Sequence, residues 1–430
     1  MRAGRTSLAN RSRRSAGTGA ALIGLLVFVV LGVSAIAAGA ALAASPSPAP
    51  AASGAAVGDP APASTITWSL TPASVVYGAS VTAQGAALPA TAGQVVTIAL
   101  DSGSGPVTVA TPTTDASGNF AATFVPTAGG SVTATLADAS AGTPITLAVA
   151  PHVAVAIGKT LPWARTRLAF TIAPASYAGL VTVNVYHHGR RVARVSGHAA
   201  AGKLVLTAPT NGIGAFKLHI VAAADGSLAA SPALARTLTA GWRRLAVGSR
   251  GVYARILLRR LAALRFRTPG ISSVISVEAG DSIVAFQKAY RLPRTYVFNA
   301  VDWRMLDHAR LIKARHKAPS THIEIDKTRQ ILMIVKGGKP YGIIAVSTGA
   351  TGNTPVGRFH ILRKAPSTST WLGSAILWRT MDFYRNFAMH GYPVVPPFPA
   401  SHGCVREPIW VADWTYRHSW VGETVYIYLS

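Results

Sequence analysis

The sequence predicts a mainly β, multidomain protein, and three observations support this fold class. A chain of 430 residues is long enough for roughly three domains, at about 150 residues each. Short runs rich in Val, Thr and Ile alternate with period two between Gly, Pro, Asn and Asp, which is the pattern of strands joined by turns. Apolar residues at the three-to-four spacing of amphipathic helices are concentrated in residues 246–310, so we expect a single small helical module.

The N-terminus has the pattern of an export segment. Residues 1–19 form a basic region with five arginines and no acidic residue, and residues 20–44 form an uncharged apolar run. At about 1.5 Å per residue, a helix of this length crosses a bilayer, and the arginines stay on the cytoplasmic side. We expect a transmembrane anchor or a signal peptide at residues 20–44 and a Pro/Ala/Ser-rich linker at residues 45–64. The rest of the chain is then extracytoplasmic.

The charge is strongly unbalanced, with 41 Lys+Arg against 15 Asp+Glu and a formal net charge of +26. Such a surface attracts polyanions, and the candidate partners are nucleic acid, anionic lipid and an anionic cell wall. The alternative is that these are ordinary solvated surface charges. The export segment argues against nucleic acid, and the sequence has no motif for reading a nucleic-acid groove. The chain has one cysteine, Cys404, so no intramolecular disulfide is possible.

Residues 65–150 and 151–240 each predict an immunoglobulin-like β domain, because alternating runs recur with turn residues at about every 8–12 positions. The segment Asp115–Phe120 is similar to the turn and strand of bacterial immunoglobulin-like repeats. His187 and His188 fall in a predicted turn and should point to opposite faces, so we predict no metal site there. The clearest strand runs are residues 80–83, 94–100, 131–136, 181–186, 191–195 and 216–220.

Residues 246–310 predict three short helices. The first carries apolar residues from Val252 to Leu264, Asp281 is placed to cap the second, and Asn299 is placed to cap the third. This segment is similar to the three-helix type of peptidoglycan-binding domain, although residues 272–280 replace that family's usual Asp-Gly-x-Phe-Gly loop. The alternative is a helical linker that only packs against its neighbour.

Residues 320–430 predict a further β domain, which we expect to be an antiparallel sheet. Runs at residues 322–326, 330–335 and 341–347 alternate, and the glycines of residues 336–339 suit a hairpin turn with positive φ. His322 and His360 fall on predicted strands, and we expect both to be surface or edge residues.

The stretch from His390 to Arg406 carries the residues of a nucleophilic site. A cysteine is mostly protonated at neutral pH, so Cys404 needs a neighbouring base, and both His390 and His402 are candidates. On a strand, His402 and Arg406 would share a face with Cys404. Gly403 allows a close backbone approach, and Arg406 offers a fork for a carboxylate. The alternatives are a buried structural cysteine, or zinc bound by His390, His402 and Cys404.

Four motifs in this domain resemble the L,D-transpeptidase catalytic domain of the YkuD type. In order, they are Ser347–Gly349, Thr354–Phe359, His390–Gly391 and Ser401–Arg406. The resemblance implies a β-sandwich in which Cys404 is acylated, His390 is the general base, and no cofactor or resident metal takes part. It also implies that His402 is catalytic, since it helps to shape the oxyanion hole and orients the base with support from Ser401. Gly403, Ser401 and Gly391 are then expected to line the oxyanion and substrate pocket, and Arg406 to hold the site or a substrate carboxylate. Glu407-Pro408 stands where an apolar residue is more usual.

The resemblance further implies peptidoglycan stem peptides as substrates and 3→3 cross-links as the product. A water acceptor would instead give an L,D-carboxypeptidase, and a domain without activity would leave a non-catalytic wall-binding protein. We expect the protein to be membrane-anchored or secreted to the cell wall, with the membrane and an anionic wall as further partners.

Overall fold

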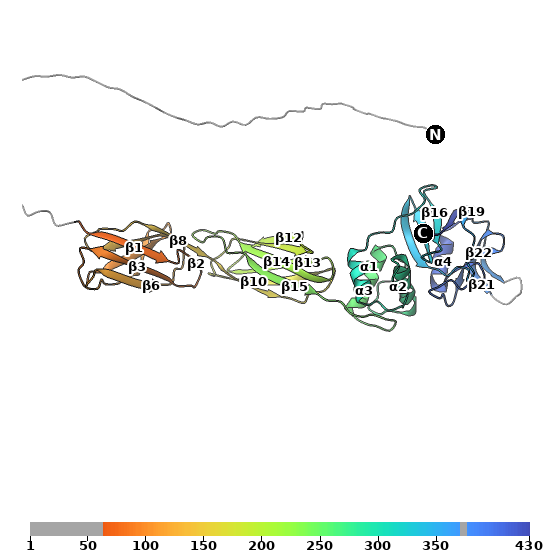
Figure 1. Cartoon of the computed structure of the whole chain (residues 1–430), viewed down its shortest axis with the longest axis horizontal. Coiled ribbons are helices and arrows are strands. Elements are labelled where there is room, and N and C mark those ends of the chain that lie inside the picture. Colours follow the sequence, from red (N-terminus) through yellow and green to blue (C-terminus); the bar gives the residue numbers. More distant parts are fainter. Residues whose placement is uncertain (1–62, 370–375) are drawn as a thin grey trace, which may run out of the picture. The chain divides into compact units, whose positions relative to one another are not determined.

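The computed structural model describes residues 63–369 and 376–430 (Figure 1). Within these ranges the chain is mainly β, with 24 strands and four helices in several domains. The basic region and the apolar run at residues 20–44 lie outside the described residues, as does nearly all of the linker. None of the helices in the described ranges combines the length and the apolar character needed to cross a membrane.

The first β domain packs two sheets, ordered β1-β3-β6 and β2-β8-β7-β4-β5. In β4 the side chains of Val96, Ile98 and Leu100 are buried while the intervening residues are partly exposed, so the period-two pattern faces the core as predicted. Its strands are β1 Thr65–Thr71, β2 Ser74–Val76, β3 Val81–Leu88, β4 Val96–Asp101, β5 Pro106–Ala110, β6 Asn119–Phe124, β7 Gly130–Leu136 and β8 Ile145–Ala150.

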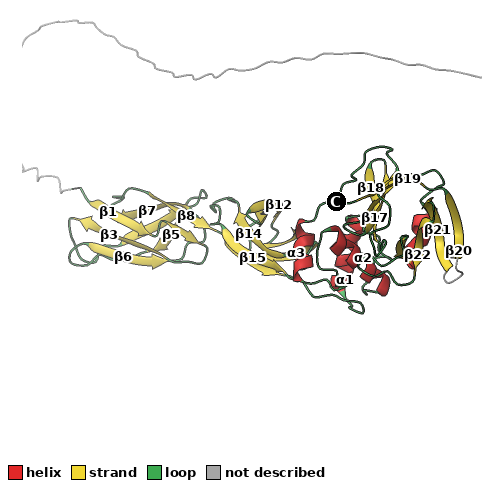
Figure 2. Ribbon diagram, turned by 45° about the vertical axis from the view of Figure 1, so that its right-hand side comes forward, coloured by secondary structure: helices red, strands yellow, loops and turns green. Residues whose placement is uncertain are grey.

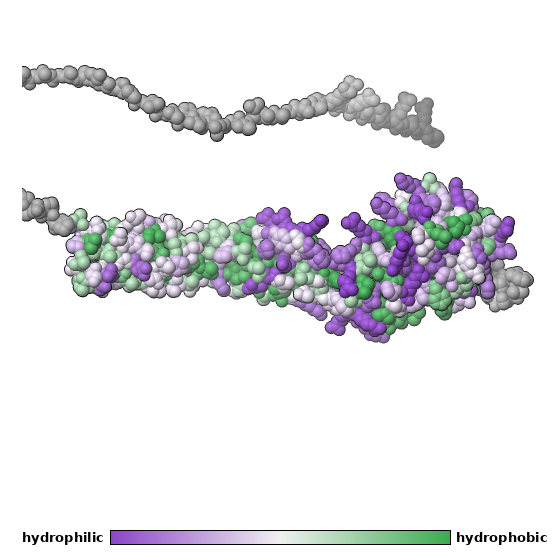
Figure 3. All heavy atoms as spheres, viewed as in Figure 1, coloured by the Kyte–Doolittle hydropathy of each residue, from purple (hydrophilic) through white to green (hydrophobic). Residues whose placement is uncertain are grey.

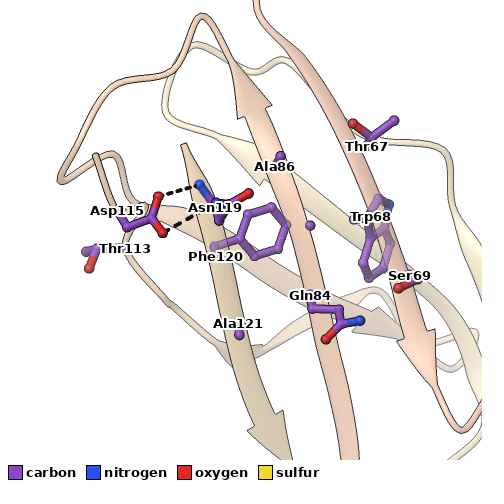
Figure 4. A pocket seen from close by; sticks show the side chains of 11 residues that line it. Thr67, Trp68, Ser69, Gln84, Ala86, Thr113, Asp115, Asn119, Phe120 and Ala121 are labelled. Carbon is purple, nitrogen blue, oxygen red and sulfur yellow. Dashed lines mark hydrogen bonds between the residues drawn. The ribbon is translucent and has the colours of Figure 1, made fainter. Parts of the chain in front are cut away.

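The predicted turn before β6 is present. Asp115 accepts a hydrogen bond from the backbone N–H of Ser117 at 2.8 Å. It accepts a second from the backbone N–H of Asn119 at 2.9 Å (Figure 4). These bonds hold the pKa of the exposed Asp115 carboxyl below its usual range, with the Asn119 bond as the largest cause. A shallow open pocket beside the turn is lined by Trp68 and Phe120 among others. Its lining contains no nucleophilic cysteine or histidine, and we assign it no function.

The second β domain is also a pair of sheets, ordered β13-β10-β9 and β12-β11-β14-β15. The predicted hairpin between β11 and β12 is present, and both His188 (φ 48°) and Gly189 (φ 75°) adopt positive φ, as in a type I′ turn. The strands are β9 His152–Ile157, β10 Ala164–Ala173, β11 Leu180–His187, β12 Arg190–His198, β13 Lys203–Thr210, β14 Gly214–Ala222 and β15 Leu234–Ala240.

Three helices follow: α1 Val252–Ala263, α2 Val277–Ala289 and α3 Ala300–His308. Asn299 caps α3 as predicted, in a reciprocal capping box with Asp302. The prediction that Asp281 caps α2 is wrong, because the helix begins four residues earlier, where the Ser276 side chain accepts a hydrogen bond from the Ala279 N–H. Asp281 instead accepts a hydrogen bond from Trp410 Nε1 at 2.9 Å.

The C-terminal domain consists of two sheets, ordered β18-β17-β16-β24-β19 and β20-β21-β22-β23. The expectation of a purely antiparallel sheet is wrong, since β16 runs parallel to β24 and β22 runs parallel to β23. Helix α4, Ile409–Arg417, packs against β21 and β22 and has no counterpart among the predicted elements (Figure 2). The strands are β16 His322–Asp326, β17 Ile331–Lys336, β18 Lys339–Ala345, β19 Gly357–His360, β20 Arg363–Ser369, β21 Ile376–Tyr384, β22 Phe387–Tyr392, β23 Val405–Pro408 and β24 Thr424–Tyr428.

One face of the five-stranded sheet packs in the same hydrophobic core as the three helices. Along β17, Met333 and Val335 pack in the core that contains α1 to α3, whereas Leu332 and Ile334 pack in the core between the two C-terminal sheets. The five-stranded sheet is therefore covered on both faces, which explains why every residue of β16 is buried.

The prediction that His322 is a surface or edge residue is wrong. This side chain is fully buried in the central strand β16, with Nε2 3.1 Å from Glu324 Oε1 and Nδ1 donating to the Pro319 carbonyl at 2.5 Å. His360 is exposed on β19, at the edge of the same sheet, and that prediction is confirmed.

Charge is distributed unevenly along the chain. Residues 65–150 contain no Lys or Arg and three Asp, whereas residues 151–430 contain 36 of the 41 basic and 11 of the 15 acidic residues, a net charge of +25 (36 − 11). Figure 3 shows the same contrast as a pale first β domain and hydrophilic side chains gathered over the later elements. The attraction to polyanions inferred from the sequence therefore belongs to residues 151–430 and to the N-terminal arginines.

Candidate active site

Cys404 lies directly before β23, the last strand of the four-stranded sheet. Its thiol is partly buried, and its Sγ contacts the Asn386 carbonyl oxygen at 3.8 Å. Burial raises the pKa of the thiol above its ordinary value, and this effect outweighs a hydrogen bond from the Ala388 backbone and the nearby Arg406 charge, which both lower it. Cys404 is the one cysteine of the chain and is not disulfide-bonded.

His390 lies on β22, the strand that pairs in parallel with β23. Its register partner is Arg406, so the two side chains lie side by side on one face of the sheet. Cys404 lies two residues before Arg406, at the start of the same strand pair. His390 is 2% exposed, and its Nδ1 donates to the Gly391 carbonyl at 3.0 Å. This bond assigns the proton of the neutral ring to Nδ1 and leaves Nε2 as a proton acceptor. Burial, aided by the Arg406 charge, lowers the pKa of His390.

Arg406 is held in place from both sides. Its Nη1 donates to the Ala400 carbonyl at 3.1 Å, and its guanidinium lies 4.3 Å from the centre of the Tyr392 ring. The backbone of Arg406 is paired with Ser347 by two hydrogen bonds of 2.9 Å. A cation fixed in this way is available to a substrate carboxylate, and it disfavours a positive charge on His390.

The turn that precedes Cys404 is closed by Ser401. The buried Ser401 Oγ donates to the Cys404 carbonyl at 2.5 Å and accepts from the Gly403 N–H at 3.0 Å. Gly403 has φ +145°, and an added Cβ would lie 2.5 Å from Phe387 Cε1, so no larger residue fits without a shift. Because Ser401 occupies the Gly403 N–H, this amide is not free to stabilise an oxyanion in this conformation.

Residues in and next to the two upstream motifs form hydrogen bonds around this turn. Thr354 Oγ1 donates to the Gly403 carbonyl at 2.6 Å and accepts from the Gly349 N–H at 2.8 Å. Asn353 Nδ2 donates to the His402 carbonyl at 2.7 Å. The structure thus brings together all four motifs that the sequence singled out. The role of Asn353 as a direct support of the turn was missed, although it stands next to a predicted motif.

His402 does not share a strand face with Cys404, because residues 402–404 form bends rather than a strand. Its side chain is exposed, while that of His390 is buried. The geometry does not favour zinc at His390, His402 and Cys404, since the group of three possible ligands that the described residues bring within 4.8 Å lies elsewhere.

The proline-rich loop between β22 and Cys404 is tied to the helical module. Arg294 Nη1 donates to the Pro397 carbonyl at 2.8 Å, and the Tyr296 hydroxyl donates to the Val395 carbonyl at 3.0 Å. From the sheet side, Ser347 Oγ donates to the Phe398 carbonyl at 2.7 Å. The helical module is therefore more than a spacer in the sequence, since its side chains hold a wall of the candidate site.

Gly391 and Glu407 support the site from behind. A Cβ on Gly391 would lie 2.8 Å from the Ala412 Cβ, so this glycine lets α4 approach β22 closely. Glu407 pairs with Gly391 across the strands and is fully buried, which raises the pKa of its carboxyl to about 7 despite a hydrogen bond from Thr415 Oγ1. The family resemblance leads us to expect an apolar residue at position 407, and the chain instead buries a carboxyl there.

The two pKa shifts predict a neutral thiol and a neutral imidazole at neutral pH, rather than a thiolate–imidazolium pair. We expect the alkylation rate of the free enzyme to rise with pH and to have its midpoint above 9.0, the ordinary value for the thiol. Iodoacetamide labelling followed by mass spectrometry measures this rate without ambiguity, because the chain has one cysteine. A rate that is already constant between about pH 5 and pH 8 would contradict the neutral pair.

The match to one protein family agrees with the motifs. Residues 320–427 match the YkuD family, described as the L,D-transpeptidase catalytic domain. Among solved structures, an L,D-transpeptidase from Xylanimonas cellulosilytica is 28% identical over 43% of this chain and 98% of its own, with a TM-score of 0.42. One from Stackebrandtia nassauensis is 22% identical over 43% and 94%, with a TM-score of 0.29. No curated protein shows a significant match to this chain.

This family match identifies the C-terminal part of the chain. Residues 320–427 are an L,D-transpeptidase catalytic domain of the YkuD type, as the sequence motifs predicted.

Proposed function

We propose that the chain is a peptidoglycan L,D-transpeptidase that works through a thioester on Cys404. The single observation that carries this proposal is the position of Cys404 beside the strand pair of His390 and Arg406, inside a domain of this family. A buried neutral imidazole with a free Nε2 is suited to take the thiol proton as the sulfur attacks.

The reaction then has two halves. The sulfur of Cys404 adds to the carbonyl of the stem tetrapeptide bond that precedes D-Ala, and His390 returns the proton to the departing D-Ala amine. The side-chain amine of a neighbouring stem next attacks the thioester, which forms the 3→3 peptide bond and restores the thiol. Arg406 is suited to hold the terminal carboxylate of the donor stem.

The roles of the surrounding residues follow from their contacts. Ser401 and Gly403 shape the turn that presents the sulfur, and Gly391 positions the strand of the base. His402, which is exposed beside the nucleophile, is assigned to the mouth of the pocket, where it would help to orient substrate.

We also propose that the protein acts outside the cytoplasm, on an anionic cell wall. The arginines before residues 20–44, the length of that apolar run and the net charge of +25 on residues 151–430 support this location. Fractionation of cells that produce the full chain should recover it with membranes or wall, and recovery in the cytoplasm alone would contradict the proposal.

The test of the reaction uses the full chain and a purified disaccharide-tetrapeptide, with products identified by mass spectrometry. We expect a dimer that has lost one D-Ala. A tripeptide without dimer would instead establish an L,D-carboxypeptidase. The absence of any D-Ala release, while the protein still sediments with wall sacculi, would establish a non-catalytic wall-binding protein and overturn the proposal.

A further inference from the structure

Two neighbouring histidines meet an aspartate from a distant part of the chain, away from the cysteine site. His187 ends β11, His188 begins the turn to β12, and Asp307 lies in the last turn of α3. Asp307 Oδ2 is 3.5 Å from His187 Nε2 and 3.3 Å from His188 Nε2. The expectation that the two histidines point to opposite faces is wrong, because the positive φ of His188 brings the ring centres to 3.9 Å.

Hydrogen bonds to the backbone orient two of the three side chains. His187 Nδ1 donates to the Ala215 carbonyl at 3.1 Å, and Asp307 Oδ1 accepts from the Ile213 N–H at 3.0 Å. Metal-binding histidines are held in this way, with the other ring nitrogen donating to a carbonyl or a carboxylate. Each of these residues therefore turns its remaining atom, Nε2 or Oδ2, toward the other.

His187 Nε2 has no hydrogen-bond partner within the described part of the chain, although its side chain is only 9% exposed. The ring cannot turn away easily, because it stacks on Phe216 with centres 4.0 Å apart and planes at 8°. A buried nitrogen without a partner is rare in native proteins and needs an explanation, of which a bound ion is one. Asp307, at 5% exposure, is equally enclosed.

The spacing fits a tetrahedral zinc ion. Zinc bonds of about 2.0–2.2 Å to nitrogen and oxygen place neighbouring ligands roughly 3.4 Å apart. The separations of 3.3 and 3.5 Å between Asp307 Oδ2 and the two histidine nitrogens match this distance, and one ligand atom from each residue lies within 4.8 Å of the other two. The His188 side chain is 60% exposed, so the fourth position opens toward solvent and suits a water ligand.

We propose that His187, His188 and Asp307 bind Zn²⁺ and that this ion joins the second β domain to the end of helix α3. The site is independent of the proposed transpeptidase reaction, since none of its residues contacts Cys404, His390 or Arg406. Its effect is to fix the joint between two domains that also meet through Trp163 and Trp303, whose rings stack with centres 6.1 Å apart.

The test measures zinc binding by the full chain, purified in detergent through a tag without histidine and stripped with EDTA. Competition with a chromogenic chelator should give about one Zn²⁺ per chain. We expect His188→Gln and Asp307→Asn each to weaken this binding at least about ten-fold. The matched control is His219→Gln, which removes an exposed histidine from β14 of the same domain and should leave the affinity unchanged.

Three outcomes would overturn the site: no stoichiometric binding by the wild type, full affinity in both variants, or an equal loss in the His219→Gln control. Because His188 is exposed, His188→Gln decides the matter even if Asp307→Asn does not fold. As a second readout, zinc should raise the Tm of the wild type and of His219→Gln but not that of His188→Gln.

Discussion

Replacement of Cys404 by alanine is expected to remove the transpeptidase activity, with a loss of about a thousand-fold or more. The reason is that the chain contains no second thiol, and the neighbouring carbonyl of Asn386 and backbone of Ala388 cannot act as nucleophiles. The measurement is the rate of dimer formation from the disaccharide-tetrapeptide.

The control for this variant is its thermal unfolding. Cys404 lies at a turn and is partly exposed, so the loss of its thiol should change stability by about 1 kcal/mol or less. An inactive variant with an unchanged Tm supports the nucleophile assignment. A variant that folds and still forms dimer would show that another group carries the reaction.

Replacement of His390 by glutamine is expected to lower kcat by about 10²- to 10⁴-fold, because the thiol then lacks a general base. KM should change little, since His390 acts on the thiol and not on substrate binding. In the wild type, kcat/KM should fall as the pH drops through the pKa of His390, which burial places below its ordinary value of 6.5. That acid limb should be absent from His390→Gln.

The matched variant is His402→Gln, which changes the exposed histidine of the same stretch. Its loss should be clearly smaller, and it should keep the acid limb of the pH profile. If His402→Gln loses the limb and His390→Gln keeps it, the assignment of the base is reversed. This pair of variants therefore decides which histidine takes the proton.

Features set by neighbouring residues were predictable from the sequence. The hairpin at Lys336–Lys339 is present. Gly337 and Gly338 adopt positive φ values of 57° and 72°, as the two glycines predict for this turn. The capping box of Asn299 and Asp302 is also local, since both residues lie within one helical turn. The ordered motifs of the catalytic domain identified its family for the same reason: each motif is a short continuous stretch.

Features that depend on distant partners were not predictable. The local sequence predicts a helix cap at Asp281, because its hydrogen-bond partner in the fold, Trp410, is 129 positions away. The parallel pairing of β22 with β23 places His390 beside Arg406. The alternation of residues within a strand does not show which strand it pairs with or in which register. The surface position expected for His322 is wrong because nothing in its own strand shows that both faces of the sheet are covered or that β24 pairs with β16.

The same limit applies to the candidate zinc site. His187 and His188 are visible as a pair in the sequence, but Asp307 lies 119 positions beyond His188 and reaches the pair only through the fold. A tandem histidine at a hairpin turn is therefore a weak signal by itself, and it becomes informative once a buried carboxylate is found beside it.

The most direct test of the central claim is the mass of the enzyme during turnover. The full chain is mixed with the disaccharide-tetrapeptide, quenched in acid during turnover and examined by intact-mass and peptide mass spectrometry. The account predicts an adduct equal to the donor stem without D-Ala, located on the peptide that contains Cys404, and its absence from Cys404→Ala. Product formation with an adduct on another residue, or a dimer formed by Cys404→Ala, would contradict the account.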